Sequence, residues 1–437
     1  MRSAPGQVLI ARLRGKAVTW PEMSEPAVRP VPAEARTGGH LWAPALFVIG
    51  ILALAFNLRG AITSLPPVFP ELASTLHLSS LTIALLAATP VLCFAVFSIP
   101  AAPLARRFGE ERVLLVSLLL LAVGLLARGA SPRLLLFPGT VLASAAIALM
   151  NVLLPSLVKR RRPDQAGLLI GLYLLSLAAG AILGSLIAVP VFQATGGSAR
   201  VTLGLWALPA MAAVLAWLPQ WRFRTTPAGQ GRGLSGGRPL VKVSRHILAW
   251  QVMGFRGLQS LIYYSALSWL PIMLRDRGAG AEHAGNLLAL MNFGNAVTAL
   301  LAPLLAQRAR DQRWLIAATV TISAVGLAGV WFAPLAGAPA WTLLFGLGQG
   351  AALGLAIYFT AARAPDPVTS ASLSAFTQGA GYLVATAGPL LVGLLHAETG
   401  TWTVAVLAML VVIVFEGAIG WQAGRARTLP APQPAEA

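Results

Sequence analysis

Residues Leu46–Ala61 read LFVIGILALAFNLRGA, and residues His246–Leu274 read HILAWQVMGFRGLQSLIYYSALSWLPIML. Together with the apolar residues around it, each stretch is long enough to cross a bilayer as a helix. One arginine interrupts each apolar run, Arg59 in the first and Arg256 in the second. A charge at the centre of a bilayer costs at least about 2.5 kcal/mol, so such residues are usually retained for a function. We therefore expect a helical membrane protein that interacts with an anion.

The composition of the whole chain is also that of a membrane protein. Of its 437 residues, 57% are hydrophobic and 11% are charged, whereas soluble domains carry about 25% charged residues. The fold class predicted from this pattern is all-α and integral to the membrane, with twelve transmembrane helices. The predicted spans are residues 45–73, 80–102, 113–130, 134–156, 165–191, 199–219, 246–273, 283–306, 313–333, 339–362, 371–396 and 401–421.

The net charge of +18 follows the predicted topology. Of the 32 Lys and Arg residues, 25 fall in segments on the side of the two termini and 5 on the opposite side, and Arg59 and Arg256 are the remaining two. An excess of positive charge marks the cytoplasmic side of a membrane protein. We therefore expect a multi-pass protein of the cytoplasmic (inner) membrane with both termini cytoplasmic. Binding of nucleic acid, another common reason for basic composition, is not expected.

The two halves of the chain repeat one another. Leu58-Arg59-Gly60 recurs 197 residues later as Phe255-Arg256-Gly257, and Ala102-Pro103-Leu104 recurs 200 residues later as Ala302-Pro303-Leu304. Duplicated halves related by an axis along the membrane normal are typical of transporters whose site lies near the bilayer midplane. The repeat thus predicts a site between the halves, with one arginine from each.

Pro66-Pro67 interrupts the first span and by itself would leave Arg59 near the outer surface. The repeat aligns Ser74 with Pro271, which lies inside the seventh span. We therefore expect the first span to continue, kinked, to about residue 73. At a helical rise of ~1.5 Å per residue, Arg59 then lies close to mid-depth.

Five glycines and six basic residues between the halves are typical of a flexible linker. The Pro-, Arg- and Ala-rich N-terminus has no apolar run long enough for a signal peptide. The predicted organisation is a disordered basic cytoplasmic tail (1–41), an N-terminal six-helix bundle (42–219), a cytoplasmic linker (220–245), a C-terminal six-helix bundle (246–421) and a cytoplasmic tail (422–437).

Four segments, in order along the chain, carry a resemblance to a known family. They are Asn57-Leu58-Arg59 with Thr63-Ser64; Asn151–Arg160; Gly257–Leu261 through Tyr264 to Trp269-Leu270-Pro271; and Gln378–Leu383 with Gly388-Pro389. These segments resemble the cyanate and 2-nitroimidazole transporter family of the major facilitator superfamily. The resemblance implies two pseudo-symmetric six-helix bundles, secondary transport by alternating access, and a small polar or anionic substrate.

Two positions depart from the family's pattern. Arg256 stands where members usually have an apolar residue before Gly-Leu-Gln-Ser. Arg106 stands where the loop after the second span usually carries an aspartate. Arg256 is therefore the residue that we expect to distinguish the substrate of this chain.

The candidate substrate-binding residues begin with Arg59, whose planar fork of donors suits an anion. A structural arginine bonded to backbone carbonyls is the alternative for Arg59, and pairing with an acid is the alternative for Arg256. Gln259 and Tyr263 follow Arg256 at i+3 and i+7, so the three share one helix face.

Gln378 and Tyr382 share a face of the eleventh span at i and i+4. Polar side chains of this kind orient small ligands, and interhelical hydrogen bonding is the alternative role for each. The weaker candidates are Asn57, Asn151, Tyr173, Asn292 and Asn295. Glu416, near the cytoplasmic end of the last span, is a candidate for proton coupling, or else extends to the membrane interface.

We expect no cofactor, no metal and no catalytic residue. The lone Cys93 forms neither a disulfide within the chain nor a metal site by itself. No P-loop motif is present, so ATP is not expected to drive transport directly. The predicted partners are a small-molecule substrate, anionic by the argument above, the lipid bilayer and, as a candidate coupling ion, the proton; we expect a monomer.

Two other functions compete with secondary transport of a small anion or polar organic molecule. A multidrug-type efflux transporter for apolar or cationic compounds would favour acidic residues in its cavity, and two arginines argue against it. A membrane-embedded enzyme would need paired carboxylates, a histidine cluster or a nucleophile with a base at bilayer depth. The sequence shows none of these arrangements, so we expect no enzymatic activity.

Overall fold

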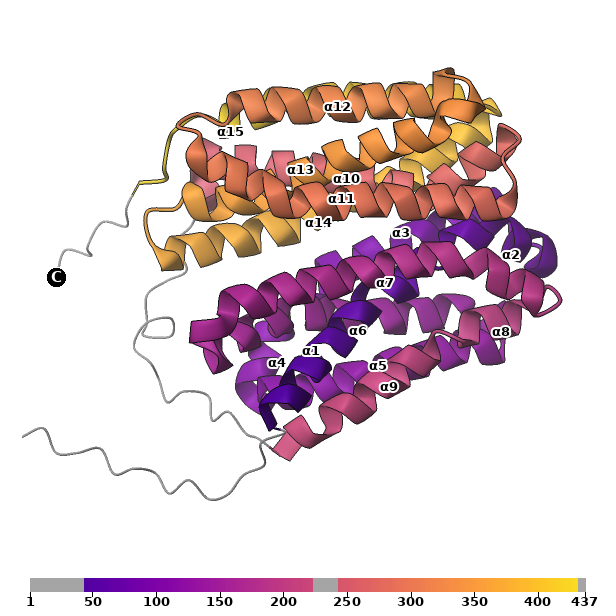
Figure 1. Ribbon diagram of the computed structural model, residues 1–437, viewed down its shortest axis with the longest axis horizontal. Helices are drawn as coiled ribbons and strands as arrows, with labels where there is room; N and C mark the ends of the chain where they lie inside the picture. The colour runs from indigo at the N-terminus through magenta and orange to yellow at the C-terminus, as the bar shows by residue number, and fades with distance from the viewer. Residues whose placement is uncertain (1–42, 223–242, 431–437) are drawn as a thin grey trace, which may run out of the picture. The chain divides into compact units, whose positions relative to one another are not determined.

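The computed structural model describes residues 43–222 and 243–430 (Figure 1). From Pro44 onward, the described residues belong to one compact unit. The predicted tail 1–41, most of the predicted linker 220–245 and the last seven residues of the predicted tail 422–437 lie outside the described residues. The predicted domain limits therefore stay predictions.

The elements of both described ranges are helical. In the first half they are α1 (Ala43–Thr63), η1 (Pro66–Val68), α2 (Phe69–Leu76), α3 (Ser80–Phe97), α4 (Ala101–Phe108), α5 (Glu110–Ala130), α6 (Pro132–Arg161), η2 (Pro163–Gln165), α7 (Ala166–Ala194), α8 (Ala199–Gly204), α9 (Ala207–Trp217) and η3 (Leu218–Arg222). In the second half they are η4 (Val243–Arg245), α10 (Ile247–Asp276), α11 (Ala281–Arg308), α12 (Arg313–Phe332), η5 (Leu335–Gly337), α13 (Ala338–Ala362), α14 (Pro367–Thr399) and α15 (Trp402–Ala423). The predicted all-α membrane fold is thereby confirmed.

Eleven helical segments within the described ranges are long and apolar enough to cross a membrane. α10 is 30 residues long but is not among them, because polar side chains such as Arg256 and Gln259 interrupt its apolar run. The crossing of α10, and with it the count of twelve, stays a prediction. α10 nevertheless carries more of the main predicted site residues than any other helix, namely Arg256, Gln259 and Tyr263.

One predicted detail agrees with the structure, and two predicted segments differ from the observed ones. Pro66 and Pro67 form a 3-10 turn, and α2 then extends the first span to Leu76, so the predicted kinked continuation is confirmed. The expected span at residues 199–219 is broken into α8 and α9. The segment predicted as a loop after the second span is the short helix α4, whose two basic residues Arg106 and Arg107 lie in its last turn.

Glycines set the close packing of helices around Arg59. A side chain at Gly180 of α7 would collide with the carbonyl oxygen of Phe56, and one at Gly184 would collide with Gly60 and Thr63. α7 therefore lies directly against α1, near the depth of Arg59. In the second half, α11 and α13 approach equally closely at Gly346. Small residues allow membrane helices to approach in this way.

The two halves meet along two pairs of helices. α3 packs against α14, and α7 packs against α11. Figure 1 shows the first half in indigo to pink and the second half in pink to yellow. η1 adds contacts to α7, α10 and α11. α1 and α10, which carry the two arginines, therefore lie beside the contact between the halves.

Candidate functional site

Arg59 of α1 contacts two consecutive tyrosines of α10. Its Nη1 donates a hydrogen bond of 3.1 Å to the hydroxyl of Tyr264. Its Cζ lies 5.5 Å from the ring centroids of both Tyr263 and Tyr264, within the range of cation–π attraction. The hydrogen-bond partner of Arg59 is thus a hydroxyl from the other half of the chain, and the arginine joins the two halves.

A second polar connection starts from the neighbouring tyrosine. The hydroxyl of Tyr263 donates to Asn292 Oδ1 of α11 at 2.9 Å, and Asn292 Nδ2 donates to Ser185 Oγ of α7 at 3.2 Å. Asn292, a weaker candidate in the sequence, is therefore part of the connection between the halves. Both tyrosine rings lie against Arg59, but only Tyr264 is hydrogen-bonded to it, whereas the hydroxyl of Tyr263 is linked to α7 through Asn292.

Arg256 has a different environment from Arg59. Its Cζ lies 5.9 Å from the ring centroid of Tyr382 on α14. Its Nη1 is buried and has no hydrogen-bond partner among the described residues. The ion pairs found in the described ranges involve neither Arg256 nor Arg59. Two guanidinium charges therefore lie within the helices without a carboxylate partner in the described part of the chain.

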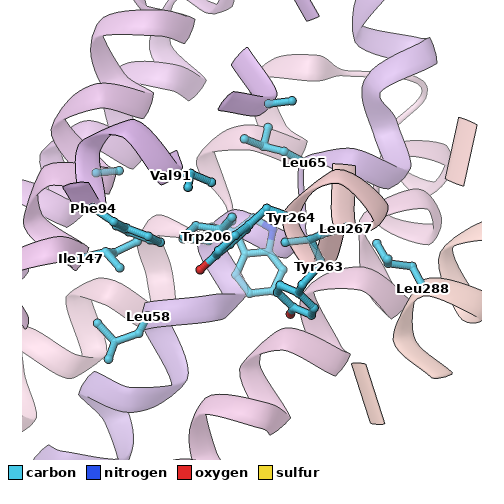
Figure 2. Close-up of a cluster of buried hydrophobic side chains, with 14 of the residues drawn as sticks. Leu58, Leu65, Val91, Phe94, Ile147, Trp206, Tyr263, Tyr264, Leu267 and Leu288 are labelled. Atoms are coloured by element: carbon cyan, nitrogen blue, oxygen red, sulfur yellow. The ribbon is translucent and has the colours of Figure 1, made fainter. Parts of the chain in front are cut away.

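Three aromatic rings pack against one another next to the two arginines, since one ring contacts Arg59 and another contacts Arg256. The centroids of Phe94 and Tyr382 are 5.6 Å apart, those of Phe94 and Tyr264 are 6.3 Å apart, and those of Tyr264 and Tyr382 are 6.5 Å apart. All three contacts are edge-to-face in type, the preferred arrangement for aromatic pairs. Figure 2 shows Phe94, Tyr264 and Tyr263 within one cluster of buried side chains. We call Phe94, Tyr264 and Tyr382 the aromatic trio.

The arginines and one ring of the trio are only partly covered. Arg59, Arg256 and Tyr382 are each partly exposed, whereas Tyr263 and Tyr264 are buried. A guanidinium exposed to lipid at mid-helix would be costly, so charged residues in membrane helices usually face the protein interior or water. We therefore expect the partly exposed guanidinium groups to face the protein interior or water and not lipid.

The predicted face of α10 contacts three different helices. Arg256 lies over Tyr382 of α14, Tyr263 bonds to α11, and Gln259 Nε2 donates to the carbonyl of Gln349 on α13 at 3.3 Å. Gln259 is 2% exposed and packs within the second half. Spacing along a helix indicates a common face but does not determine which neighbour each side chain meets.

The remaining candidates divide by their partners. Gln378 Nε2 donates to Ser374 within α14 at 3.0 Å, and Gln378 remains half-exposed. Tyr173 is buried on α7, the helix that packs against α1. The amide nitrogen of Asn57 donates to two backbone carbonyls of the first half.

Two further asparagines lack a described link to the arginines. Asn151 is half-buried on α6. Asn295 is 8% exposed, its Nδ2 has no partner among the described residues, and its backbone oxygen lies where a Cβ at Gly350 would stand. We therefore leave these two outside the candidate site.

Glu416 is 1% exposed, and neither of its carboxylate oxygens has a hydrogen-bond partner among the described residues. The alternative that its side chain extends to the membrane interface is wrong, because α15 turns this residue inward. Its neighbours Gly417 and Gly420 pack against α12 and α10. A role in proton coupling stays a prediction.

Sequence reasoning missed two residues of the site. Tyr264 was recognised only as part of a family-like segment, because it lies one position beyond the predicted face of α10. Phe94 carries no polar group that would single it out in the apolar α3. A search for aromatic residues next to a candidate ligand residue would have found Tyr264 but not Phe94.

Comparison with known proteins identifies the family. Residues 45–383 match the Major Facilitator Superfamily. The chain is 39% identical over 382 residues to the 2-nitroimidazole transporter of Escherichia coli (strain K12). This alignment covers 87% of this chain and 95% of that relative. The chain is 31% identical over 361 residues to the cyanate transport protein CynX of the same organism, covering 80% of this chain and 90% of that relative.

A solved structure agrees with the fold. A bacterial homologue of the human lysosomal transporter Spinster, in an inward-facing and occupied conformation, matches with a TM-score of 0.72 at 15% identity. The match covers 90% of this chain and 100% of that chain. The multi-pass helical fold and the resemblance carried by the four sequence segments are both confirmed, and the chain belongs to the major facilitator superfamily of transporters.

Proposed function

We propose that the protein is a secondary transporter that moves a small anion or small polar organic molecule across the cytoplasmic membrane by alternating access. The substrate binds between the two halves, near Arg59 and Arg256. The observation that supports this most directly is the buried Nη1 of Arg256, which has no partner in the described residues. A buried donor without an acceptor costs free energy, and an anionic ligand would satisfy it.

The two positive charges favour an anion for a second reason. Neither arginine has a carboxylate partner in the described ranges. Like charges in a medium of low dielectric constant repel each other, and an anion between them removes that repulsion. The names of the two relatives point the same way, since cyanate is a small anion and 2-nitroimidazole is a small polar molecule.

The test is binding to purified full-length protein, followed by thermal unfolding. A ligand that binds only the folded state at 100 times its Kd stabilises it by about 2.7 kcal/mol. We expect cyanate, acetate or benzoate to raise the melting temperature, and Arg59→Ala to remove this shift. Arg200→Ala is the matched control, because it removes the same charge from an exposed position on α8.

Two results would contradict the proposal. One is a panel of small anions and polar neutral molecules in which no compound shifts the melting temperature of the unsubstituted protein. The other is a folded Arg59→Ala variant that retains the full ligand shift and the full rate of uptake into proteoliposomes.

A further inference from the structure

We propose that the first half binds the headgroup of an anionic phospholipid between Arg112 and Trp221, at the end of the molecule where α5 begins. This site is separate from the two arginines of α1 and α10, and it does not depend on what the protein transports. The inference rests on a comparison of the two halves, which carry the same pair of side chains in different states.

An arginine lies over a tryptophan at corresponding positions of the two halves. In the first half, Cζ of Arg112 lies 5.8 Å from the ring centroid of Trp221. In the second half, Cζ of Arg313 lies 5.5 Å from the ring centroid of Trp421. The two arginines are 201 residues apart and the two tryptophans 200, which matches the offset of the repeat. Both distances lie within the range of cation–π attraction, so the pair is part of the duplicated architecture.

The two arginines differ in their charged partners. Arg313 donates from Nε to Asp311 Oδ2 at 2.8 Å, and its Nη2 lies 2.8 Å from the same oxygen. Arg112 forms no ion pair with any described residue, and its Nε is buried without a hydrogen-bond partner there. Arg112 is only half-buried, so its side chain remains accessible to an anion from outside the chain. Arg313 has its anion within the chain, whereas Arg112 lacks one.

The acidic residues next to Arg112 lie inside the protein. Glu110 and Glu111 are 8% and 2% exposed in the first turn of α5, and Glu110 pairs with Arg160 of α6. The preceding helix α4 carries no acid, and its two arginines in the last turn are exposed. The exposed charges of α4 and of the first turn of α5 are therefore all positive. Such a surface attracts anions.

An apolar strip leads from Arg112 along the outside of α5. Val116, Leu119, Val123 and Leu126 follow at i+4, i+7, i+11 and i+14, a spacing that places them on one helix face, and each is about half exposed. α9 packs beside α5 (Figure 1) and exposes three more apolar side chains, Leu208, Met211 and Leu215. The acyl chains of a phospholipid can lie along this strip, whereas a free phosphate gains nothing from it. The occupant that fits both the charge and the strip is a lipid.

The predicted position in the membrane fits an anionic headgroup. Trp221 is 50% exposed, and tryptophan is enriched where a membrane meets water. Under the topology predicted from the basic residues, α5 begins on the cytoplasmic side, where basic side chains attract anionic lipids. A guanidinium binds phosphate through two parallel N–H donors. A phosphate on Arg112 would leave the rest of the headgroup beside the ring of Trp221.

The experiment measures the affinity of the first bound lipid for purified, delipidated full-length protein by native mass spectrometry. Phosphatidylglycerol has a net negative charge, phosphatidylcholine carries the same phosphate with a compensating cation, and glycerol phosphate lacks the acyl chains. One basic residue near a membrane surface changes the affinity for an anionic lipid roughly fivefold. We therefore expect phosphatidylglycerol to bind roughly fivefold more tightly than phosphatidylcholine, and glycerol phosphate not to displace it.

Variants of the two halves test the assigned residues. Arg112→Gln removes the receptor of the phosphate and Trp221→Leu removes the ring beneath it, so each should abolish the preference for phosphatidylglycerol. Arg313→Gln and Trp421→Leu are the matched controls, because they alter the corresponding pair, whose arginine is already bound to Asp311. These two variants should retain the preference. Trp221 is half-exposed, so Trp221→Leu reports on the site even if Arg112→Gln fails to fold.

Each contrary outcome overturns a different part of the proposal. Equal affinities for phosphatidylglycerol and phosphatidylcholine would exclude a site for anionic lipid. Displacement of phosphatidylglycerol by glycerol phosphate would show a site for phosphate alone, in which the acyl chains have no part. Equal losses in the variants of both halves would mean that general surface charge attracts the lipid, and not the pair of Arg112 and Trp221. None of these results bears on the proposed transport function, which is tested by ligands at Arg59 and Arg256.

Discussion

Arg275 Nη1 donates to Glu71 Oε1 at 2.6 Å, and this ion pair joins the end of α10 in the second half to α2 in the first. The side chains of Arg275 and Glu71 are 25% and 17% exposed. Under the topology predicted from the distribution of basic residues, this end of the molecule faces outward. The pair links the two halves, and under this predicted topology it does so on the side away from the cytoplasm.

The next two residues of the chain make contacts within the second half. Asp276 Oδ2 accepts a hydrogen bond of 2.6 Å from Trp402 Nε1 of α15. Arg277 donates to the carbonyls of Val330 and Ala333 at the end of α12. Among the described residues, Arg275 is the one of these three consecutive charged residues that bonds across the halves. Alternating access would require that contact to break, while the other two keep the end of α10 in place.

Arg275→Gln should favour the conformation in which the halves separate at this end. Partly exposed ion pairs contribute up to about 1 kcal/mol, which corresponds to roughly a fivefold change in a conformational equilibrium. The measurement is the labelling rate of a cysteine introduced by Ser268→Cys, in a protein whose own Cys93 is replaced by serine. Ser268 is 5% exposed and faces the pocket beside Tyr264.

Arg277→Gln serves as the control, because it removes a neighbouring charge whose contacts stay within one half. Labelling should accelerate in Arg275→Gln and not in Arg277→Gln. Equal rates in the two variants would show that the pair with Glu71 does not hold the halves together.

Tyr264→Phe should lower the stability of the ligand-free protein and enlarge the stabilisation by an anion. The substitution retains the ring of the aromatic trio but removes the hydroxyl that accepts from Arg59. Leaving a charged donor unsatisfied costs about 1–3 kcal/mol. A bound anion would supply the missing acceptor, so its thermal shift should exceed that of the unsubstituted protein.

Thermal unfolding with and without benzoate measures both effects. Tyr358→Phe is the matched control, since Tyr358 lies on α13 and contacts a phenylalanine ring. A Tyr264→Phe variant with unchanged stability and an unchanged ligand shift would mean that the bond to Arg59 contributes nothing to either.

Much of the fold was predictable from the sequence because membrane helices follow simple composition rules. Long apolar runs located the helices, and the repeat placed Arg59 and Arg256 at corresponding positions. Composition is a weaker guide to membrane spans where a helix carries several polar residues. For this reason α10 does not count as a span by composition alone. Hydropathy also placed the start of the third span at residue 113, although Glu110 and Glu111 are buried in the first turn of α5.

The site was only partly predictable, because helix periodicity indicates a face but not a partner. Tyr263 and Tyr264 are adjacent in sequence and bond to different helices. The inward position of Glu416 depends on how α15 packs against α10 and α12, which one chain's pattern does not reveal. Contacts of this kind follow from tertiary packing and could be found only in the structure.

Arg363→Ala should destabilise the cytoplasmic end of the second half, under the predicted topology, without affecting ligand binding. Arg363 is 5% exposed, and its guanidinium donates to the carbonyls of Ala423 and Gly424 and to the side chain of Gln312. It therefore donates to carbonyls at the end of α15, where no following helical turn supplies N–H donors. Losing several such bonds should cost about 1–3 kcal/mol.

Chemical or thermal unfolding measures the loss, with Arg427→Ala as a control at an exposed position close by. Arg161, 202 residues earlier, makes the corresponding contact in the first half by donating to Gln220 at 2.9 Å. Arg161→Ala should therefore also be destabilising. A stability of Arg363→Ala equal to that of Arg427→Ala would show that these bonds do not support the end of α15.

Glu416→Gln should retain the fold and remove the dependence of transport on an imposed pH gradient. A buried carboxyl group without a partner is far less costly when protonated than when ionised, so a neutral amide of the same shape should be tolerated. Ionisable residues within membrane helices are also frequent carriers of coupled protons. Uptake of labelled benzoate into proteoliposomes, with and without a pH gradient, tests the coupling, and exchange at equal pH reports whether the variant still transports. If the variant accumulates benzoate along the gradient as the unsubstituted protein does, Glu416 is not the proton carrier, and its burial reflects the packing of α15 alone.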